Sequence, residues 1–121
     1  MKPIERSLGT RVSFLLPSLK LKGIAEGGST LEQSVHQFLV TQFDGYTATS
    51  SNLFGYWKDE AGNDSYGEHR QFSVALKQDE KLPELKKYLS SLASQMDEEC
   101  IYLDTGGSAT LIYRQSSNSA A

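Results

Sequence analysis

The chain has 121 residues and a formal net charge of −3, with 12 basic and 15 acidic side chains. This length suits one hydrophobic core and is too short for two. We therefore predict a single α+β domain over residues 1–114, followed by a flexible polar tail over residues 115–121. The mildly acidic composition argues against a dedicated nucleic-acid binder, which needs a basic surface.

The cysteine count and the apolar runs narrow the class of protein further. A single cysteine, Cys100, cannot form an intramolecular disulfide, and one cysteine with two histidines is a poor ligand set for zinc. The longest N-terminal apolar run, 14–16, is too short for a signal peptide and ends at Pro17. No segment approaches the ~20 apolar residues of a membrane span. We expect a cytoplasmic protein that uses no metal, no cofactor and no membrane.

The first predicted elements are a strand and a long loop. Apolar and polar side chains alternate over residues 10–16, which indicates a half-buried strand. Residues 17–28 form a loop that is long for so small a domain. Lys20 and Lys22 in this loop precede a helix start and are candidates for anion binding, whereas the alternative is a solvated loop.

The first helix is predicted to begin at the capping-box pattern Ser29-Thr30-Leu31-Glu32. Apolar side chains follow at helical spacing up to Phe43, and Gly45 is expected to end the helix in a left-handed conformation. His36 lies in the middle of this helix, at the edge of the apolar stripe. We interpret His36 as structural, because the sequence identifies no hydrogen-bond partner that would make it a catalytic base.

A long β-hairpin is predicted next, from two β-like segments at 46–57 and 66–77 that flank a polar turn. Side chains at period two from Phe72 to Leu76 are expected to face the helices. His69 then points to the opposite face, together with other polar or small side chains.

The rest of the chain completes the predicted fold. A second helix starts near residue 79, with Pro83 close to its first turn, and strands follow at 100–104 and 109–114. The order β-α-β-β-α-β-β predicts a two-layer sandwich of the ferredoxin-like type, an antiparallel sheet covered on one face by two helices. The other sheet face is left uncovered, so we expect a homo-oligomer, most simply a homodimer.

The candidate ligand-binding residues lie in the predicted hairpin. They are Tyr56, Trp57, Tyr66, Glu68, His69 and Arg70. Aromatic side chains can wall a ring-shaped ligand, and a Glu and an Arg on one strand face can line a pocket. The alternatives are a cross-strand aromatic pair that holds the hairpin together, and charges that are solvated or paired locally.

Two further features are interpreted as structural. Cys100 has no CxxC partner and is expected to be a small thiol without a catalytic role. Gly106-Gly107 is expected to be a hairpin turn, because neither a Lys-Ser/Thr pair nor a helix follows it.

Part of the chain resembles a known group of domains. The stretches Phe43-Asp44-Gly45-Tyr46-Thr47 and Gly55-Tyr56-Trp57-Lys58-Asp59-Glu60-Ala61-Gly62, followed by Glu68, match the pattern F-x-G-x-T … G-x-W-x-x-x-x-G … E. This pattern resembles small bacterial ferredoxin-like domains of unknown function, over roughly residues 30 to 104. The resemblance implies a ferredoxin-like α+β fold, and it brings no established activity and no catalytic residue.

The leading functional hypothesis is a non-enzymatic, homo-oligomeric domain that binds a small ligand or another protein. It rests on a complete foldable pattern that carries no convincing catalytic set. One alternative is a small dimeric α+β enzyme that uses Glu68, His69 or His36 as acid and base. Another is a phage or mobile-element protein that sequesters a nucleotide signal, for which the sequence offers no positive mark.

Overall fold

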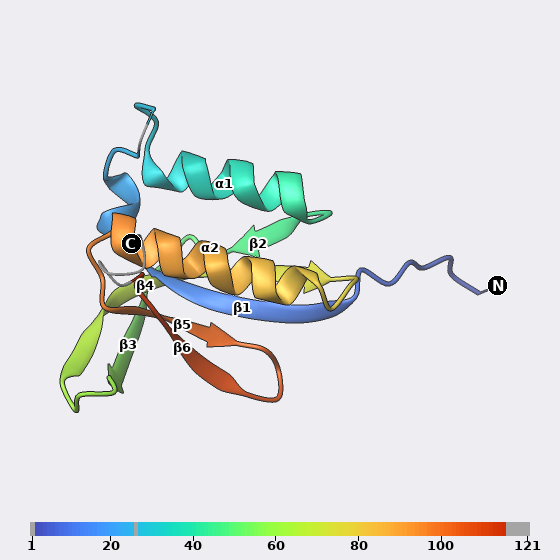
Figure 1. Ribbon diagram of the computed structural model, residues 1–121. Coiled ribbons are helices and arrows are strands. Elements are labelled where there is room, and N and C mark those ends of the chain that lie inside the picture. Colours follow the sequence, from blue (N-terminus) through green and yellow to red (C-terminus); the bar gives the residue numbers. More distant parts are fainter. Residues whose placement is uncertain (1, 26, 116–121) are drawn as a thin grey trace.

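The computed structural model describes residues 2–25 and 27–115 (Figure 1). Its elements in chain order are β1 (Thr10–Pro17), the short 3-10 helix η1 (Lys20–Lys22), α1 (Leu31–Gln42), β2 (Tyr46–Ala48), β3 (Leu53–Lys58), β4 (Asp64–Leu76), α2 (Lys81–Gln95), β5 (Cys100–Asp104) and β6 (Ala109–Tyr113). The predicted polar tail falls almost wholly on residues 116–121, outside the described residues. Within the described part of the chain, no helix is long and apolar enough to span a membrane.

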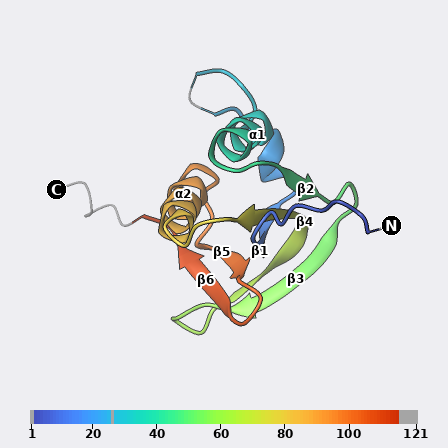
Figure 2. The same ribbon diagram turned by 90° about the vertical axis from the view of Figure 1, so that its right-hand side faces the viewer.

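The strands form one antiparallel sheet, and both helices pack against one of its faces (Figures 1 and 2). The strand order is β2-β4-β1-β5-β6, with β3 pairing to the far end of β4 beyond β2. The predicted class is therefore confirmed: an α+β protein with an antiparallel sheet and two helices. Long β4 is the organising strand, because β1, β2 and β3 all pair with it.

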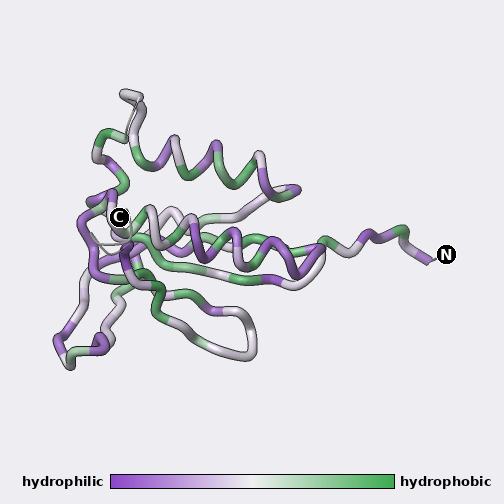
Figure 3. Tube along the Cα trace, in the orientation of Figure 1, coloured by the Kyte–Doolittle hydropathy of each residue, from purple (hydrophilic) through white to green (hydrophobic). Residues whose placement is uncertain are grey.

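The hydrophobic core lies between the helices and the sheet. Phe14 of β1 and Phe72 of β4 occupy paired positions and stack with ring centroids 5.8 Å apart. As predicted, the side chains from Phe72 to Leu76 at period two are buried against the helices. In Figure 3 the helices alternate between hydrophobic and hydrophilic residues, as amphipathic helices do.

The second predicted strand is interrupted, which gives six strands where the sequence indicated five. Residues 49–52 separate β2 from β3 and leave the regular ladder. Their polar groups still reach β4: the Thr49 hydroxyl accepts the backbone N–H of Gln71 at 2.9 Å. The polar run Ser50-Ser51-Asn52 favours such a break, because short polar side chains compete with ladder hydrogen bonds.

The ends of α1 also differ from the prediction by a small shift. The N-cap is Thr30, not Ser29, and its capping partner is Gln33, whose side chain accepts the Thr30 N–H at 3.0 Å. Gly45 does not adopt a positive φ, because the chain leaves α1 through extended Phe43 and enters β2 directly.

The β3–β4 hairpin bends over the sheet face that lies opposite the helices (Figure 2). Its Trp57 ring lies 5.6 Å from the ring of Tyr102 on β5. At the hairpin tip, the backbone N–H of Glu60 donates to the hydroxyl of Tyr113 on β6 at 2.7 Å. The expectation that this face is left uncovered is therefore wrong at the end near the hairpin, where the chain covers its own sheet.

Candidate functional site

The hairpin divides the six predicted site residues between its two faces, because successive strand residues point in opposite directions. Trp57 and His69 point inward, toward the sheet that the hairpin covers. The other four belong to the opposite parity: Tyr56, Tyr66, Glu68 and Arg70. The predicted set therefore does not form one site.

On the inner face, His69 is buried in contact with Trp57. The side chain is only 5% exposed, and the two ring centroids lie 5.2 Å apart. Nδ1 lies 2.9 Å from the carbonyl oxygen of Gly67; since a carbonyl only accepts, the proton is on Nδ1. Burial lowers the pKa of His69, and the Gly67 hydrogen bond offsets only part of that effect. His69 is thus a neutral packing residue and not an accessible acid or base.

The Trp57 indole packs on the inner face against Gly55. It lies so close to the backbone of Gly55 that a Cβ on that residue would be 2.5 Å from Cζ3 of the ring. The indole N–H is buried and has no hydrogen bond of normal geometry to a described residue, although it faces the Cys100 thiol. Burial raises the pKa of Cys100, and the indole N–H lowers it to a smaller extent. A buried thiol with a raised pKa is unreactive, in agreement with the structural interpretation.

On the outer face, three aromatic side chains gather in the open. We call Phe54, Tyr56 and Tyr66 the outer aromatic face; their exposed fractions are 70%, 53% and 68%. Tyr66 lies between the other two, with ring centroids 6.5 Å from Phe54 and 6.4 Å from Tyr56. Tyr56 and Tyr66 are among the predicted site residues, and Phe54 joins them because the alternation along β3 places it on the same face.

A charged group fixes one end of the outer aromatic face. The Tyr56 hydroxyl donates to Asp64 at 2.6 Å, and the Lys58 ammonium donates to the same carboxylate oxygen at 2.8 Å. Lys58 accordingly lowers the pKa of Asp64, and the neighbouring carboxylate raises the pKa of Tyr56. The ring of Tyr56 is therefore held in place, which lowers the entropy that it would lose on binding.

Glu68 holds the segment between β2 and β3 in place. Its carboxylate accepts the Asn52 side-chain amide at 2.8 Å, and the Asn52 carbonyl accepts the Ser18 hydroxyl at 2.6 Å. The backbone N–H of Ser18 also donates to the carbonyl of Glu68 at 3.0 Å. Glu68 is exposed and points away from buried His69, so the two do not converge as an acid–base pair.

Arg70 connects the sheet to α1 and does not pair with Glu68. Its Nη1 lies 2.8 Å from the carboxylate of Glu32 on α1, and its Nε donates to the carbonyl of Thr49 at 2.7 Å. The guanidinium lies over the Phe72 ring, 5.4 Å from the centroid. The candidate Glu68–Arg70 pair is therefore wrong, because the partner comes from a helix that is remote in sequence.

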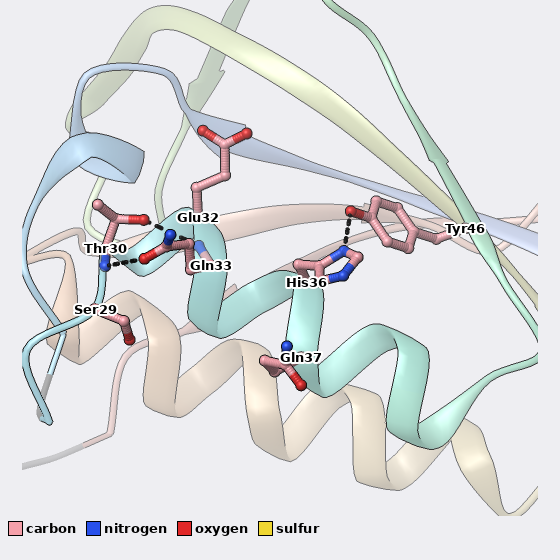
Figure 4. Close-up of a pocket in the computed structure, with 7 residues that line it drawn as sticks. All are labelled: Ser29, Thr30, Glu32, Gln33, His36, Gln37 and Tyr46. Carbon is pink, nitrogen blue, oxygen red and sulfur yellow. Dashed lines mark hydrogen bonds between the residues drawn. The ribbon is translucent and has the colours of Figure 1, made fainter.

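Beside this ion pair, the start of α1 and strand β2 border a pocket of about 700 Å³ (Figure 4). His36 and Tyr46 point toward each other there, with 2.8 Å between Nδ1 and the hydroxyl oxygen. Helical periodicity does not reveal this contact, because the partner of His36 lies on the strand after the helix. The remaining lining residues are polar: Ser29, Thr30, Glu32, Gln33 and Gln37.

Lys20 and the Gly106-Gly107 pair have structural roles. Lys20 donates to the carbonyl of Met96 at 2.7 Å, so it caps the end of α2 and does not form an open anion site. Gly106 and Gly107 lie in the tight turn between β5 and β6, as predicted. Among residues 2–25 and 27–115, no group of three or more His, Cys, Asp or Glu side chains is placed to hold a metal ion.

Comparison with known proteins found no match: no family model, no curated protein and no solved structure matches this chain.

Proposed function

We propose that this protein is a non-enzymatic protein-interaction domain that works as a homo-oligomer and binds a partner protein through the outer aromatic face. The observation that carries the proposal is the exposure of three neighbouring aromatic rings on one hairpin, with Tyr66 in contact with both Phe54 and Tyr56. Exposed apolar side chains are ordinary when scattered, but a contiguous group of them marks an interaction surface.

The chemistry of the outer aromatic face suits a protein partner. Tyrosine and phenylalanine are enriched at the centre of protein interfaces, where each ring that becomes fully buried contributes on the order of 2 kcal/mol. Polar groups surround the rings, with the Lys58–Asp64 pair at one end and Glu68 at the other. This arrangement of an aromatic centre with a charged rim is the usual anatomy of an interface hot spot.

The hairpin is also rigid enough to present these rings. Its inner face is held to the sheet by Trp57, through contacts with His69 and Tyr102. Its tip is held by the hydrogen bond from Glu60 to Tyr113. A preorganised surface loses less conformational entropy on binding than a mobile loop does.

The same geometry favours a protein over the alternatives. An enzyme that uses Glu68 and His69 would need both side chains in one pocket, whereas one is exposed and the other is buried on the opposite face. A nucleic-acid partner would need several free cations near the rings, but Lys58 is paired with Asp64.

The proposal is tested by affinity capture from the lysate of the source cell with quantitative mass spectrometry. The test variant is Phe54→Ser/Tyr56→Ser/Tyr66→Ser. The matched control, Leu19→Ser/Ile24→Ser/Val40→Ser, removes three other exposed apolar side chains. We expect a protein that is enriched by the wild type and by the control, and lost with the test variant. Loss with both variants, or with neither, contradicts the proposal.

A second candidate function is small-ligand binding, which the pocket at the start of α1 favours. Its volume of about 700 Å³ is that of a ligand site, and the His36–Tyr46 pair supplies convergent polar groups. Nucleotides and sugars can be screened by NMR titration of the His36 and Tyr46 resonances. Shifts that saturate in the wild type and vanish in Tyr46→Phe support this function, and their absence with every compound counts against it.

For the fold, we propose the ferredoxin-like type with an interrupted second strand and one extra edge strand. The order β5-β1-β4 and then β2 with β3 fits the four-stranded split βαβ arrangement if β2 and β3 are one interrupted strand. Strand β6 is then an extra edge strand. The resemblance to small bacterial domains of unknown function and the cytoplasmic location stay predictions.

A further inference from the structure

Among the described residues, strand β6 is an edge of the sheet and has backbone groups that lack partners. It pairs only with β5, and the hydrogen-bonded pairs of that ladder include Glu99 with Arg114 and Thr105 with Ser108. In an antiparallel ladder, the residues between such pairs direct their N–H and C=O groups away from the neighbouring strand. On β6 these residues are Ala109, Leu111 and Tyr113.

Most of these outward groups have no hydrogen bond to another described residue. The exception is the carbonyl of Tyr113, which accepts the Ser90 hydroxyl of α2 at 2.7 Å. A carbonyl has two lone pairs, so it can accept a second hydrogen bond. The outer side of β6 is therefore a nearly complete template for another strand.

The side chains of β6 do nothing to prevent such pairing. The strand reads Ala-Thr-Leu-Ile-Tyr, with no charge and no proline, and four of its five residues are only partly exposed. The opposite edge is protected in the usual ways: β2 has three residues, the ladder breaks after it, and β3 bends away and ends in Lys58. The contrast singles out β6 as the strand adapted for pairing.

We infer that a second copy of this chain pairs with β6, antiparallel to it, about a two-fold axis at Leu111. This inference rests on the homo-oligomer part of the proposed function and names its surface. In this register Leu111 faces the same residue of the second copy, and Ala109 faces Tyr113. The free N–H and C=O groups of Ala109, Leu111 and Tyr113 in one copy then face the free groups of the same three residues in the other. This register allows up to about six main-chain hydrogen bonds.

A second copy fits this edge better than a different protein. The three outward residues are spaced symmetrically about Leu111, so one two-fold operation satisfies all of them at once. The small side chain of Ala109 lies opposite the large one of Tyr113 on both sides of the axis, so the side chains fit without crowding. The two sheets become one continuous sheet, and both outer aromatic faces stay free for partners.

A charge exchange at Leu111 tests the inference. We would measure the mass of the full chain over a concentration series by sedimentation, for the wild type, Leu111→Glu, Leu111→Lys and a mixture of the two variants. Like charges face each other across the axis in each variant alone, and opposite charges do so in the mixture. We expect a wild-type dimer, a dissociation constant at least about tenfold higher for each variant alone, and recovery of the dimer in the mixture.

The control and a second measurement keep the test decisive. Leu53→Glu places the same charge at the opposite edge and should leave the dimer intact. Amide exchange of wild-type Leu111 and Tyr113 should slow as concentration rises, which needs no variant to fold. A wild-type monomer at all concentrations overturns both this inference and the homo-oligomer part of the proposed function. A dimer that persists in both Leu111 variants but dissociates in the outer-face triple variant overturns this inference alone.

Discussion

Adding one methyl group at Gly55 should release the hairpin from the sheet. A Cβ at this position would lie 2.5 Å from Cζ3 and 3.1 Å from Cη2 of Trp57, and 3.3 Å from Nδ1 of His69. Carbon atoms in contact prefer about 3.5–4.0 Å, so the indole must move by roughly 1 Å. Such overpacking costs about 1–3 kcal/mol. Gly55 has no positive φ, so backbone strain adds nothing to this cost.

The assay is urea unfolding of Gly55→Ala followed by fluorescence, because Trp57 is the only tryptophan and reports on the packing directly. The matched control is Gly107→Ala, at a glycine with no atom within 4 Å of the added Cβ and no positive φ. We expect a loss of ~2 kcal/mol and a red-shifted native emission for Gly55→Ala, with little change in the control. Equal stability and unchanged emission for Gly55→Ala would refute the packing of the indole on Gly55.

Three further predictions concern single side chains. The pKa of buried His69 is lowered in the folded protein, so its contribution to stability is complete above about pH 6.5 and is lost as pH falls through the folded pKa, by ~1.4 kcal/mol per unit of lowering. In urea unfolding measured from about pH 7.5 to 5, His69→Asn should flatten the dependence of stability on pH. An unchanged slope in this variant would contradict the assignment of the pH dependence to His69. Tyr88→Phe removes a buried hydroxyl that has no hydrogen bond of normal geometry to any described residue, although it lies near the Ser34 side chain. Burial raises the pKa of this hydroxyl to about 12, and the variant keeps the stack on Phe38. The midpoint of thermal unfolding should rise slightly, and a clear fall would mean that the hydroxyl is bonded. Thr30→Ala should cost ~1 kcal/mol of unfolding free energy and Ser29→Ala almost nothing, and equal effects would contradict the observed cap.

The elements that periodicity predicted well are those with one buried and one exposed face. In β4, burial at period two from Phe72 to Leu76 fixed both the strand and its orientation, because a shift of one residue would expose all three side chains. The two helices were predicted from single apolar stripes for the same reason. Their ends were less certain, since neighbouring Ser29 and Thr30 are both good caps and only the structure distinguishes them.

The bend of the hairpin over the sheet could not be predicted from local patterns. It depends on contacts between Trp57 on β3 and residues of β5, which are remote in sequence. One local signal was available: Gly55 and Gly67 are opposite each other in the ladder, and two facing glycines leave room for a large ring beside them. The burial of His69 follows from this feature.

The candidate site was predicted in part. Tyr56 and Tyr66 lie together, as their positions across a hairpin turn suggest. Arg70 was assigned the wrong partner, because sequence proximity favours Glu68 whereas the ion pair forms with Glu32 on α1. Where a helix layer meets a sheet, tertiary packing decides which charged groups a long side chain can reach. Alternation along one strand shows only which face the side chain is on.

Photo-crosslinking inside the source cell tests most directly whether the outer aromatic face contacts a partner protein. A benzoylphenylalanine in place of Tyr66 keeps an aromatic side chain in the middle of the face, and the same group in place of exposed Lys87 on α2 is the control. We predict a crosslinked product with a second polypeptide from position 66 and none from position 87. No product from position 66, or equal products from both positions, would contradict the claim.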